Sequence, residues 1–448
     1  MLDPKELAIL TTALTRLDAG FRKLPEIHGK ADDLARFSEV LSATAERLRD
    51  NFPYFHPLYA GQMLKPPHPV ARLAYALAMY INPNNHALDG GRATSAMEKE
   101  AVAEIATMFG WTEFLGHLCG GGTMANLEAL WVAGQLQPGK KILASEQAHY
   151  THKRISAVLK LEFEPVSCDN FGRMDLNDLE SRLKAGDVGT VVATLGTTAT
   201  GSVDPLSEIL VLRERYDVRL HVDAAYGGYF KLASNLAAPA KRAFDCITQA
   251  DSIVIDPHKH GLQPYGCGCV LFRNPGVGKL YKHESPYTYF SSAELHLGEI
   301  SLECSRPGAA AAALWATQKL LPLVPGLEFA NGLEAGREAA LRLYERLRES
   351  SVFLPAFEPE LDILVFLPKE TSGTAASRRS RRTFDAAAKR DLHLAVADLP
   401  SRFWSGNAAF HSQQTVTCLR SALMKPEHLP WIDEIFSRLT AAHADTQF

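Results

Sequence analysis

Short apolar segments alternate with helical segments along the middle of the chain. Six of them are rich in β-branched and aliphatic residues, and most are separated by stretches with apolar residues at helical spacing: KILASE, FEPVSC, TVVATLGTT, VRLHVDAA, DSIVIDPHK and GCGCVLFRN. Near-continuous Val, Ile and Leu in TVVATL and SIVI is typical of strands buried on both faces, as in a mostly parallel sheet covered by helices. GCGCVLFRN follows the preceding strand too closely for a crossover helix, so we expect it to run antiparallel. The pattern predicts an α/β domain.

One helix between these strands has clear limits. In DLNDLESRLKAG, Asp175 is a plausible N-cap, Leu recurs at helical spacing, and Gly186 follows the end. We interpret this helix as scaffold.

The pattern restarts in the last third of the chain. Pro322, Pro325 and Gly326 end an Ala-rich helix, and GLEAGREAALRLYERLRES and LDILVFLP follow as a new helix and a new strand. We therefore expect a helical N-terminal segment, a large domain and a small C-terminal domain, over residues 1–55, 56–325 and 326–448 respectively.

The composition is that of an ordinary folded protein. Of 448 residues, 46% are hydrophobic and 22% are charged, which excludes an intrinsically disordered chain. The formal net charge of −4 excludes a global basic field, so we expect no nucleic-acid partner. GTAASRRSRRTFDAAAKR groups four arginines in five positions. We interpret this group as the solvated start of a helix, with a nucleic-acid patch or a targeting signal as the alternatives.

Three features bear on the cellular compartment. No uninterrupted apolar stretch reaches about 18 residues, and the segment MLDPKELAILTTALTRLDAGFRK carries charges too often for a signal peptide. Seven cysteines suit free thiols in a reducing compartment. We expect a cytoplasmic protein without a membrane span.

Cys267 and Cys269 share one face of a strand and lack a second pair, so we expect structural thiols and no metal site.

The most informative segment is DSIVIDPHKHG, where a buried strand ends in Asp256, Pro257, His258 and Lys259. Ligands bind at strand ends in open α/β sheets. A lysine just outside an apolar strand can lose its hydration, which lowers its pKa and frees its amine to form a Schiff base with an aldehyde. The alternative is a solvent-facing turn lysine, and this segment alone leaves both interpretations open.

A second strand, in HVDAAYGGYF, ends in Asp223 followed by Ala224 and Ala225. A carboxylate at this place could hold a proton on the ring nitrogen of pyridoxal phosphate, and small neighbours would let a flat ring lie against the chain. The alternative is an aspartate that caps a helix.

Three further segments carry candidate binding residues. GHLCGGGTMANLEAL places a glycine run before a helix that opens between Thr123 and Asn126, where free backbone N–H groups would receive a phosphate. In SEQAHYTHK, His149 follows a strand end and could stack on a ring, or be a histidine satisfied by its neighbours. In ATLGTTATGSVDPL, Thr197 and Thr198 could donate hydroxyls to a cofactor, or cap a turn.

The order of these segments, ending in HVDAA and DPHK, resembles the group II pyridoxal-phosphate-dependent amino-acid decarboxylases, a family of fold-type I enzymes. The resemblance runs from FHPLYAGQM to TCLRSALMKPEH and so covers most of the chain. It implies a large domain with a mostly parallel seven-stranded sheet flanked by helices, and a smaller α+β domain. It also implies pyridoxal 5'-phosphate as cofactor, an amino-acid substrate, and a homodimer with its active sites at the subunit interface.

The same resemblance assigns roles to individual residues. Lys259 would form the Schiff base with the cofactor, Asp223 would pair with the ring nitrogen, and His149 would stack on the ring. The other residues implied to bind the cofactor are Gly121, Gly122, Thr123, Thr197, Ala225 and His258. In SPYTYFSS, Tyr287 or Tyr289 would be the loop tyrosine that protonates the intermediate, or both simply pack. Gln62 and Arg420 would bind the substrate.

The resemblance leaves the reaction and the substrate open to alternatives. ECSRPGAAAAALW is also similar to the sphingosine-phosphate lyases, and the cofactor residues would serve a lyase or an aminotransferase equally. A non-catalytic protein of the same fold would have a broken site, whereas Lys259, Asp223 and His149 are all present. We therefore expect decarboxylation of an aromatic or acidic L-amino acid.

Overall fold

The computed structural model describes residues 3–25, 33–86, 88–282, 300–404 and 414–446. Its helices are α1 (Pro4–Ala19), α2 (Leu34–Leu48), α3 (Pro69–Met79), α4 (Leu88–Met108), α5 (Gly122–Leu136), α6 (Thr151–Val158), α7 (Leu176–Leu183), α8 (Leu206–Tyr216), α9 (Ala238–Asp245), α10 (Gly278–Tyr281), α11 (Gly308–Leu320), α12 (Glu328–Glu349), α13 (Gly373–Ala388) and α14 (Ile432–Ala444). Its strands are β1 (Leu115–Cys119), β2 (Lys141–Ser145), β3 (Phe163–Val166), β4 (Val188–Thr194), β5 (Arg219–Asp223), β6 (Ser252–Ile255), β7 (Gly268–Phe272), β8 (Phe353–Pro355), β9 (Ile363–Pro368), β10 (Ala395–Pro400) and β11 (Thr415–Ala422).

The larger sheet has seven strands in the order β1-β7-β6-β5-β4-β2-β3. Strands β6, β5, β4, β2 and β3 run parallel, and β7 runs antiparallel to both β6 and β1. The six predicted strands and the antiparallel direction of β7 are confirmed. The sequence pattern did not predict strand β1, because Gly116 and His117 interrupt its apolar residues.

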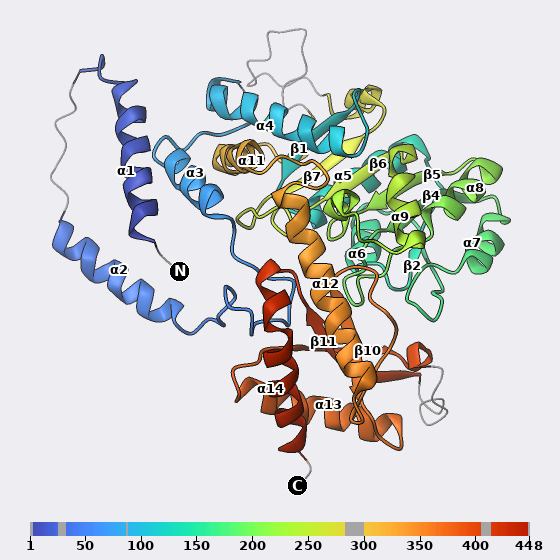
Figure 1. Ribbon diagram of the computed structural model, residues 1–448. Helices are drawn as coiled ribbons and strands as arrows, with labels where there is room; N and C mark the ends of the chain where they lie inside the picture. The colour runs from blue at the N-terminus through green and yellow to red at the C-terminus, as the bar shows by residue number, and fades with distance from the viewer. Residues whose placement is uncertain (1–2, 26–32, 87, 283–299, 405–413, 447–448) are drawn as a thin grey trace.

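Helices cover the large sheet, as Figure 1 shows. Helix α5 packs across β4 to β7, α8 packs on β5, and every residue of β4 is buried. The limits predicted for α7 are confirmed. The Asp175 side chain accepts hydrogen bonds from the backbone amides of Asn177 and Asp178, and Gly186 beyond the helix has φ +75°.

The smaller sheet has four antiparallel strands in the order β10-β11-β9-β8. Helices α12 and α13 pack on it, α14 packs against both of these helices, and α12 reaches from the large sheet to the small one (Figure 1). The α/β class, with a mostly parallel large sheet and a smaller α+β part, is confirmed. The division of the chain at residues 325 and 326 stays a prediction, consistent with the start of α12 at Glu328.

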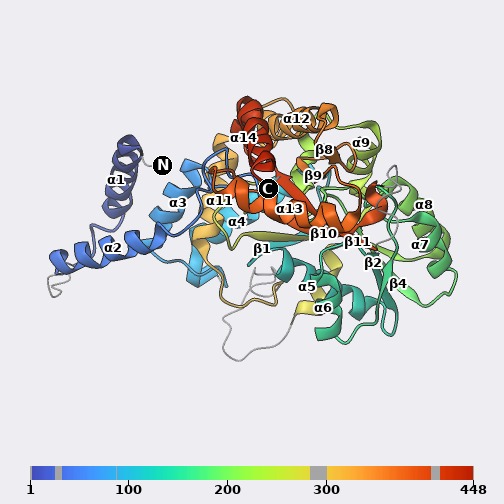
Figure 2. The ribbon, with the colours of Figure 1, turned by 90° about the horizontal axis from the view of Figure 1, so that it is seen from below.

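The N-terminal helices lie at the edge of the molecule. Helix α1 contacts α3 and forms an ion pair of 3.1 Å with it, between Glu6 and Arg72. Helix α2 lies on the outer side of the molecule, away from both sheets, in both views (Figures 1 and 2). Neither helix has a buried residue. Within the described ranges, no helix combines the length and apolar character needed to cross a membrane.

Candidate active site

A cavity of about 560 Å³ opens where strands β5 and β6 end and helix α5 begins. Residues that the sequence placed on separate segments line it together. They are Gly121, Gly122, Thr123, His149, Asp223, Ala225, His258 and Lys259.

The glycine run forms a tight turn from β1 into α5. Gly121 has φ +144°, a conformation that side-chain-bearing residues rarely adopt, and α5 begins at Gly122 without a side-chain cap. A Cβ on Gly121 would lie 3.0 Å from Cε1 of His258, and one on Gly122 would lie 2.7 Å from Oδ2 of Asp256. Only glycine fits this close approach. The turn therefore offers the uncapped first amides of a 15-residue helix to an anion.

Lys259 lies beside a carboxylate that the sequence analysis did not assign to the site. Its Nζ is 3.0 Å from Oδ2 of Asp256, which is 2% exposed. Asp256 also lies 3.5 Å from Nε2 of His258, and burial lowers the pKa of that histidine. The Lys259 amine is therefore held by an ion pair at the cavity wall and is not simply isolated in apolar surroundings.

Asp223 is buried, and both of its carboxylate oxygens have hydrogen-bond partners. Its Oδ2 lies 2.8 Å from Nε2 of His152 and accepts from Nδ2 of Asn126 at 3.3 Å, while its Oδ1 accepts from the Ala225 amide at 3.1 Å. Burial alone would raise the pKa of Asp223, but the hydrogen bond and charge of His152, with the Lys259 charge, lower it below its ordinary value. Asp223 is thus an anionic carboxylate at the cavity wall.

A further histidine fixes the Asn126 amide. His221 lies inside β5, and burial lowers its pKa to about 3, so its ring is neutral. Its Nε2 is 2.8 Å from Oδ1 of Asn126, and its Nδ1 is 2.9 Å from the hydroxyl of Ser252. Donation from Nε2 to the Asn126 oxygen turns the Asn126 NH₂ group toward Asp223. The sequence analysis missed His152 and Asn126, although His152 follows His149 by one helical turn.

His149 lines the cavity with a neutral ring. Burial lowers its pKa, and its Nδ1 is 2.8 Å from the hydroxyl of Thr151. Its ring also packs against that of Tyr150, with centroids 4.4 Å apart. The ring is therefore positioned by its own segment.

The structure does not bring Thr197 to the cavity. Its hydroxyl is 2.8 Å from that of Thr200 and accepts from the Ser202 amide, so it closes a turn, and Gly196 and Thr198 line the cavity instead. Tyr287 and Tyr289 lie outside the described residues.

A neighbouring cavity of about 420 Å³ contains the two predicted substrate-binding residues. Gln62 and Arg420 line it, and His149 and Thr198 line both cavities. Arg420 is 4% exposed and donates to the carbonyls of Gly61, Thr198 and Ala199 at 2.9, 2.7 and 3.0 Å. In the part of the chain that the structure describes, no carboxylate lies within 4.0 Å of its guanidinium. A buried cation without an acidic partner is suited to an anionic ligand.

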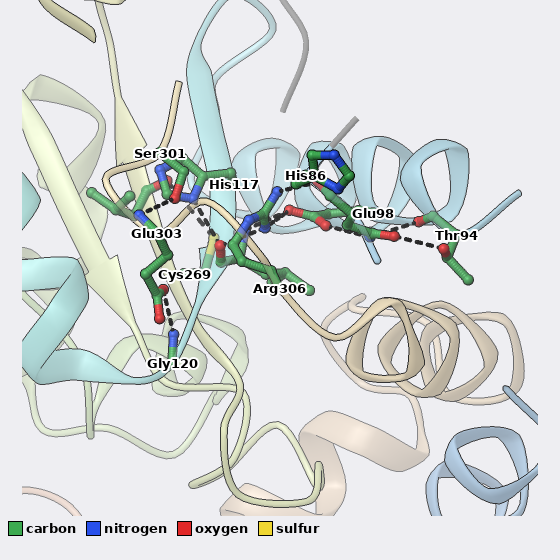
Figure 3. A network of polar contacts seen from close by, with 12 residues as sticks. His86, Thr94, Glu98, His117, Gly120, Cys269, Ser301, Glu303 and Arg306 are labelled. Carbon is green, nitrogen blue, oxygen red and sulfur yellow. Dashed lines mark hydrogen bonds and ion pairs between the residues drawn. The ribbon is translucent and has the colours of Figure 1, made fainter. Parts of the chain in front are cut away.

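A network of polar contacts supports the glycine turn (Figure 3). Glu303 lines the first cavity, and its Oε2 accepts from the Gly120 amide at 2.9 Å. Arg306 forms an ion pair with Glu98 and donates to the Leu118 carbonyl at 2.7 Å. Through these contacts, residues 303–306 hold the end of β1 and the first residue of the turn that follows it.

Comparisons with known proteins agree with this geometry. Residues 131–369 match the model described as the pyridoxal-dependent decarboxylase conserved domain. An L-tyrosine decarboxylase from Enterococcus faecium is 28% identical, over 87% of this chain and 85% of the relative. A probable L-tyrosine/L-aspartate decarboxylase from Methanothermobacter thermautotrophicus is 30% identical, over 68% of this chain and 82% of the relative. The structure of Oryza sativa TDC with PLP and tryptamine is similar in fold, with a TM-score of 0.79, 16% identity, and coverage of 100% of this chain and 99% of that chain.

Proposed function

The chain belongs to the pyridoxal-dependent decarboxylase family and decarboxylates an amino acid, and we propose that its substrate is an aromatic or acidic L-amino acid. The names of the tyrosine and aspartate decarboxylases among its relatives support both substrate classes. One observation carries the assignment of the site. The Lys259 amine, the anionic Asp223 and the uncapped first turn of α5 face a single cavity.

The residues present fit pyridoxal 5'-phosphate. The glycine turn has no room for a side chain but leaves N–H groups free for a phosphate, and His258 lies against Gly121. Asp223 is an anion at the place where a protonated ring nitrogen needs one, and Ala225 beside it is small. Lys259 would hold the cofactor's aldehyde carbon. When bound, the cofactor supplies an electron sink for the pair of electrons left as carbon dioxide departs.

The protein's own residues orient the reaction. Asp223 keeps its negative charge because His152 and Asn126 stabilise it, so it can retain a proton on the ring nitrogen. Asp256 positions the Lys259 amine at the cavity wall. The His149 ring is neutral and lines the cavity, so it can lie flat against a cofactor ring.

We propose that Arg420 and Gln62 bind the substrate. Three N–H groups of Arg420 bond to backbone carbonyls, which leaves two of its five for a substrate carboxylate. Among the described residues, no carboxylate forms an ion pair with its guanidinium within 4.0 Å. The proton that replaces carbon dioxide would come from Tyr287 or Tyr289.

We also propose a homodimer that works in the cytoplasm. Large apolar side chains on the N-terminal helices are exposed, which favours burial against a second copy of the chain; they are Leu7, Ile9, Leu34, Phe37, Val40, Leu41 and Leu48. All seven cysteines are free thiols, as a reducing compartment requires.

The experiment that tests the function monitors carbon dioxide and amine release from a panel of L-amino acids. We expect stoichiometric carbon dioxide and amine from an aromatic or acidic member. Release of neither product from any member, or transfer of the amino group without carbon dioxide, would overturn the proposed substrate classes. Lys259→Ala should abolish both turnover and the visible absorbance of the protein-bound cofactor, whereas the exposed Lys184→Ala should change neither.

A further inference from the structure

A separate cavity of about 540 Å³ lies between α3, the start of α12 and the segment that follows β11. It shares no lining residue with the two cavities of the candidate active site. The two cavities are close together, since Lys259 lines the active-site cavity and the next residue, His260, lines this one. The Asp362 carboxylate separates the two: its Oδ1 accepts from Tyr226 on the active-site side, and its Oδ2 is 3.3 Å from Nε2 of His260.

Two lysines line this cavity, and both donate hydrogen bonds to backbone carbonyls. Nζ of Lys65 donates to the Met424 carbonyl at 3.3 Å, and Nζ of Lys425 donates to the carbonyls of Tyr54 and Tyr59 at 3.2 and 2.6 Å. Among the residues described, no carboxylate oxygen lies within 4.0 Å of either ammonium. An ammonium has three N–H groups, so Lys65 has two unused and Lys425 has one.

The positive charge at this cavity comes from Lys65 and Lys425. Lys425 is 3% exposed, and burial lowers the pKa values of Lys65 and Lys425 to about 8 and about 7. His260 is 1% exposed, and burial holds its pKa well below its ordinary value, so its ring is neutral and adds no charge. The buried Asp362 carboxylate interacts with the charges of both Lys65 and Arg420. A single carboxylate cannot neutralise two cations, so the lysines can still attract an added anion.

The rest of the lining restricts what that anion can be. The walls are mostly apolar and include Pro66, Pro67, Leu262, Leu321, Phe329 and Leu333. The carboxylates of Glu328 and Glu427 also line the cavity and are exposed to solvent. Exposed carboxylates would repel a phosphate dianion but would attract an ammonium group. Cationic groups inside and carboxylates outside match the two charges of an amino acid.

We propose that this cavity is a second binding site, which takes a small carboxylate of the amino-acid class, with Lys65 and Lys425 holding the carboxylate and Glu328 and Glu427 facing the ammonium. The first turn of α12, which has no side-chain cap, adds its amides to the same wall. The site is independent of the cofactor and of the reaction at Lys259.

The experiment measures the rate at which acetic anhydride modifies Lys65 in the holoenzyme, by mass spectrometry of peptides. Lys65 is partly exposed, and its lowered pKa makes it reactive near neutral pH. L-leucine, L-phenylalanine and L-aspartate are the probes, with their α-carboxamides as matched ligands without an α-carboxylate. We expect at least one amino acid to slow modification of Lys65 about tenfold at saturation, while its amide and inorganic phosphate leave the rate unchanged. The exposed Lys184 should be modified at the same rate with and without each ligand.

Variants separate a bound carboxylate from other causes. Lys425→Gln should raise the ligand concentration that gives half-maximal protection about tenfold, because one charged hydrogen bond is lost. Lys425→Arg should retain protection, and it shows whether a substitution at this position leaves the fold intact. Lys184→Gln is the matched control. Three results would overturn the proposal: no protection by any of the three amino acids, equal protection by phosphate, or protection without ligand that rises with protein concentration. The last result would mean that a second copy of the chain covers the cavity.

Discussion

Asp223 accepts three hydrogen bonds, and an asparagine in its place cannot accept them all. Its Oδ2 faces His152 and Asn126, and its Oδ1 faces the Ala225 amide, all of which donate. A carboxylate accepts at both oxygens, whereas an asparagine has one oxygen and one NH₂ group. In either orientation the NH₂ group of Asp223→Asn would face a buried donor.

The magnitude follows from that mismatch. A buried donor left unsatisfied costs about 1–3 kcal/mol, and hydrogen bonds that lose their ionic partner weaken by about 1 kcal/mol. We expect Asp223→Asn to lower the free energy of unfolding by about 2–4 kcal/mol at neutral pH. Because the folded pKa of Asp223 lies below its unfolded value, this stabilisation is present above about pH 4 and is lost as the pH falls through the folded pKa.

The assay is urea unfolding followed by circular dichroism, on cofactor-free protein at one fixed protein concentration. Asp175→Asn is the matched control, because asparagine caps a helix as well as aspartate does and should change stability by less than about 0.5 kcal/mol. The difference between wild type and Asp223→Asn should stay constant from about pH 5 to 8 and shrink only in acid. Equal stability of the two proteins between pH 5 and 8 would refute the hydrogen-bond scheme.

Three further predictions follow from contacts at the site. Gly122→Ala should weaken cofactor binding at least about tenfold in a fluorescence titration, because its Cβ would lie 2.7 Å from the Asp256 carboxylate; unchanged affinity would contradict this. Arg306→Met should lower the free energy of unfolding by about 3–5 kcal/mol in urea, and adding Glu98→Gln should cost less than the sum of the single changes; strict additivity would exclude coupling. Arg420→Lys should raise KM about tenfold or more with the fold intact, because one ammonium cannot replace three fixed N–H donors; an unchanged KM would remove Arg420 from substrate binding.

The sequence predicted the central sheet because most of its strands carry their own signal. Strands β4 and β6 are buried at every position, and their runs of Val and Ile are typical of strands covered on both faces. Strand β1 had no such signal, since glycine and histidine interrupt it, and pairing with β7 supplies the order that its sequence lacks. The N-terminal helices were predicted as helical, but nothing in their sequence indicated that α2 would stand apart from the core.

Part of the site could be predicted from the ends of strands. Asp223 is the last residue of β5 and Lys259 follows β6, and parallel strands bring their carboxyl ends to one edge, so both reach the same cavity. Thr197 also follows a strand, yet the next residues turn its hydroxyl toward Thr200 and away from the cavity. The direction of a side chain within a loop depends on hydrogen bonds that residue type and spacing do not specify.

The polar residues that support the site did leave a signal, in the form of histidines inside apolar strands. A buried histidine needs a polar partner, and His117 in β1 and His221 in β5 both find theirs on α5, at Glu128 and Asn126. These two bonds tie α5 to strands on either side of it, so the helix cannot rotate or slide without breaking both. Because the first turn of α5 is the proposed phosphate-binding turn and Asn126 also reaches Asp223, the same two histidines fix the distance between the two ends of the cofactor site.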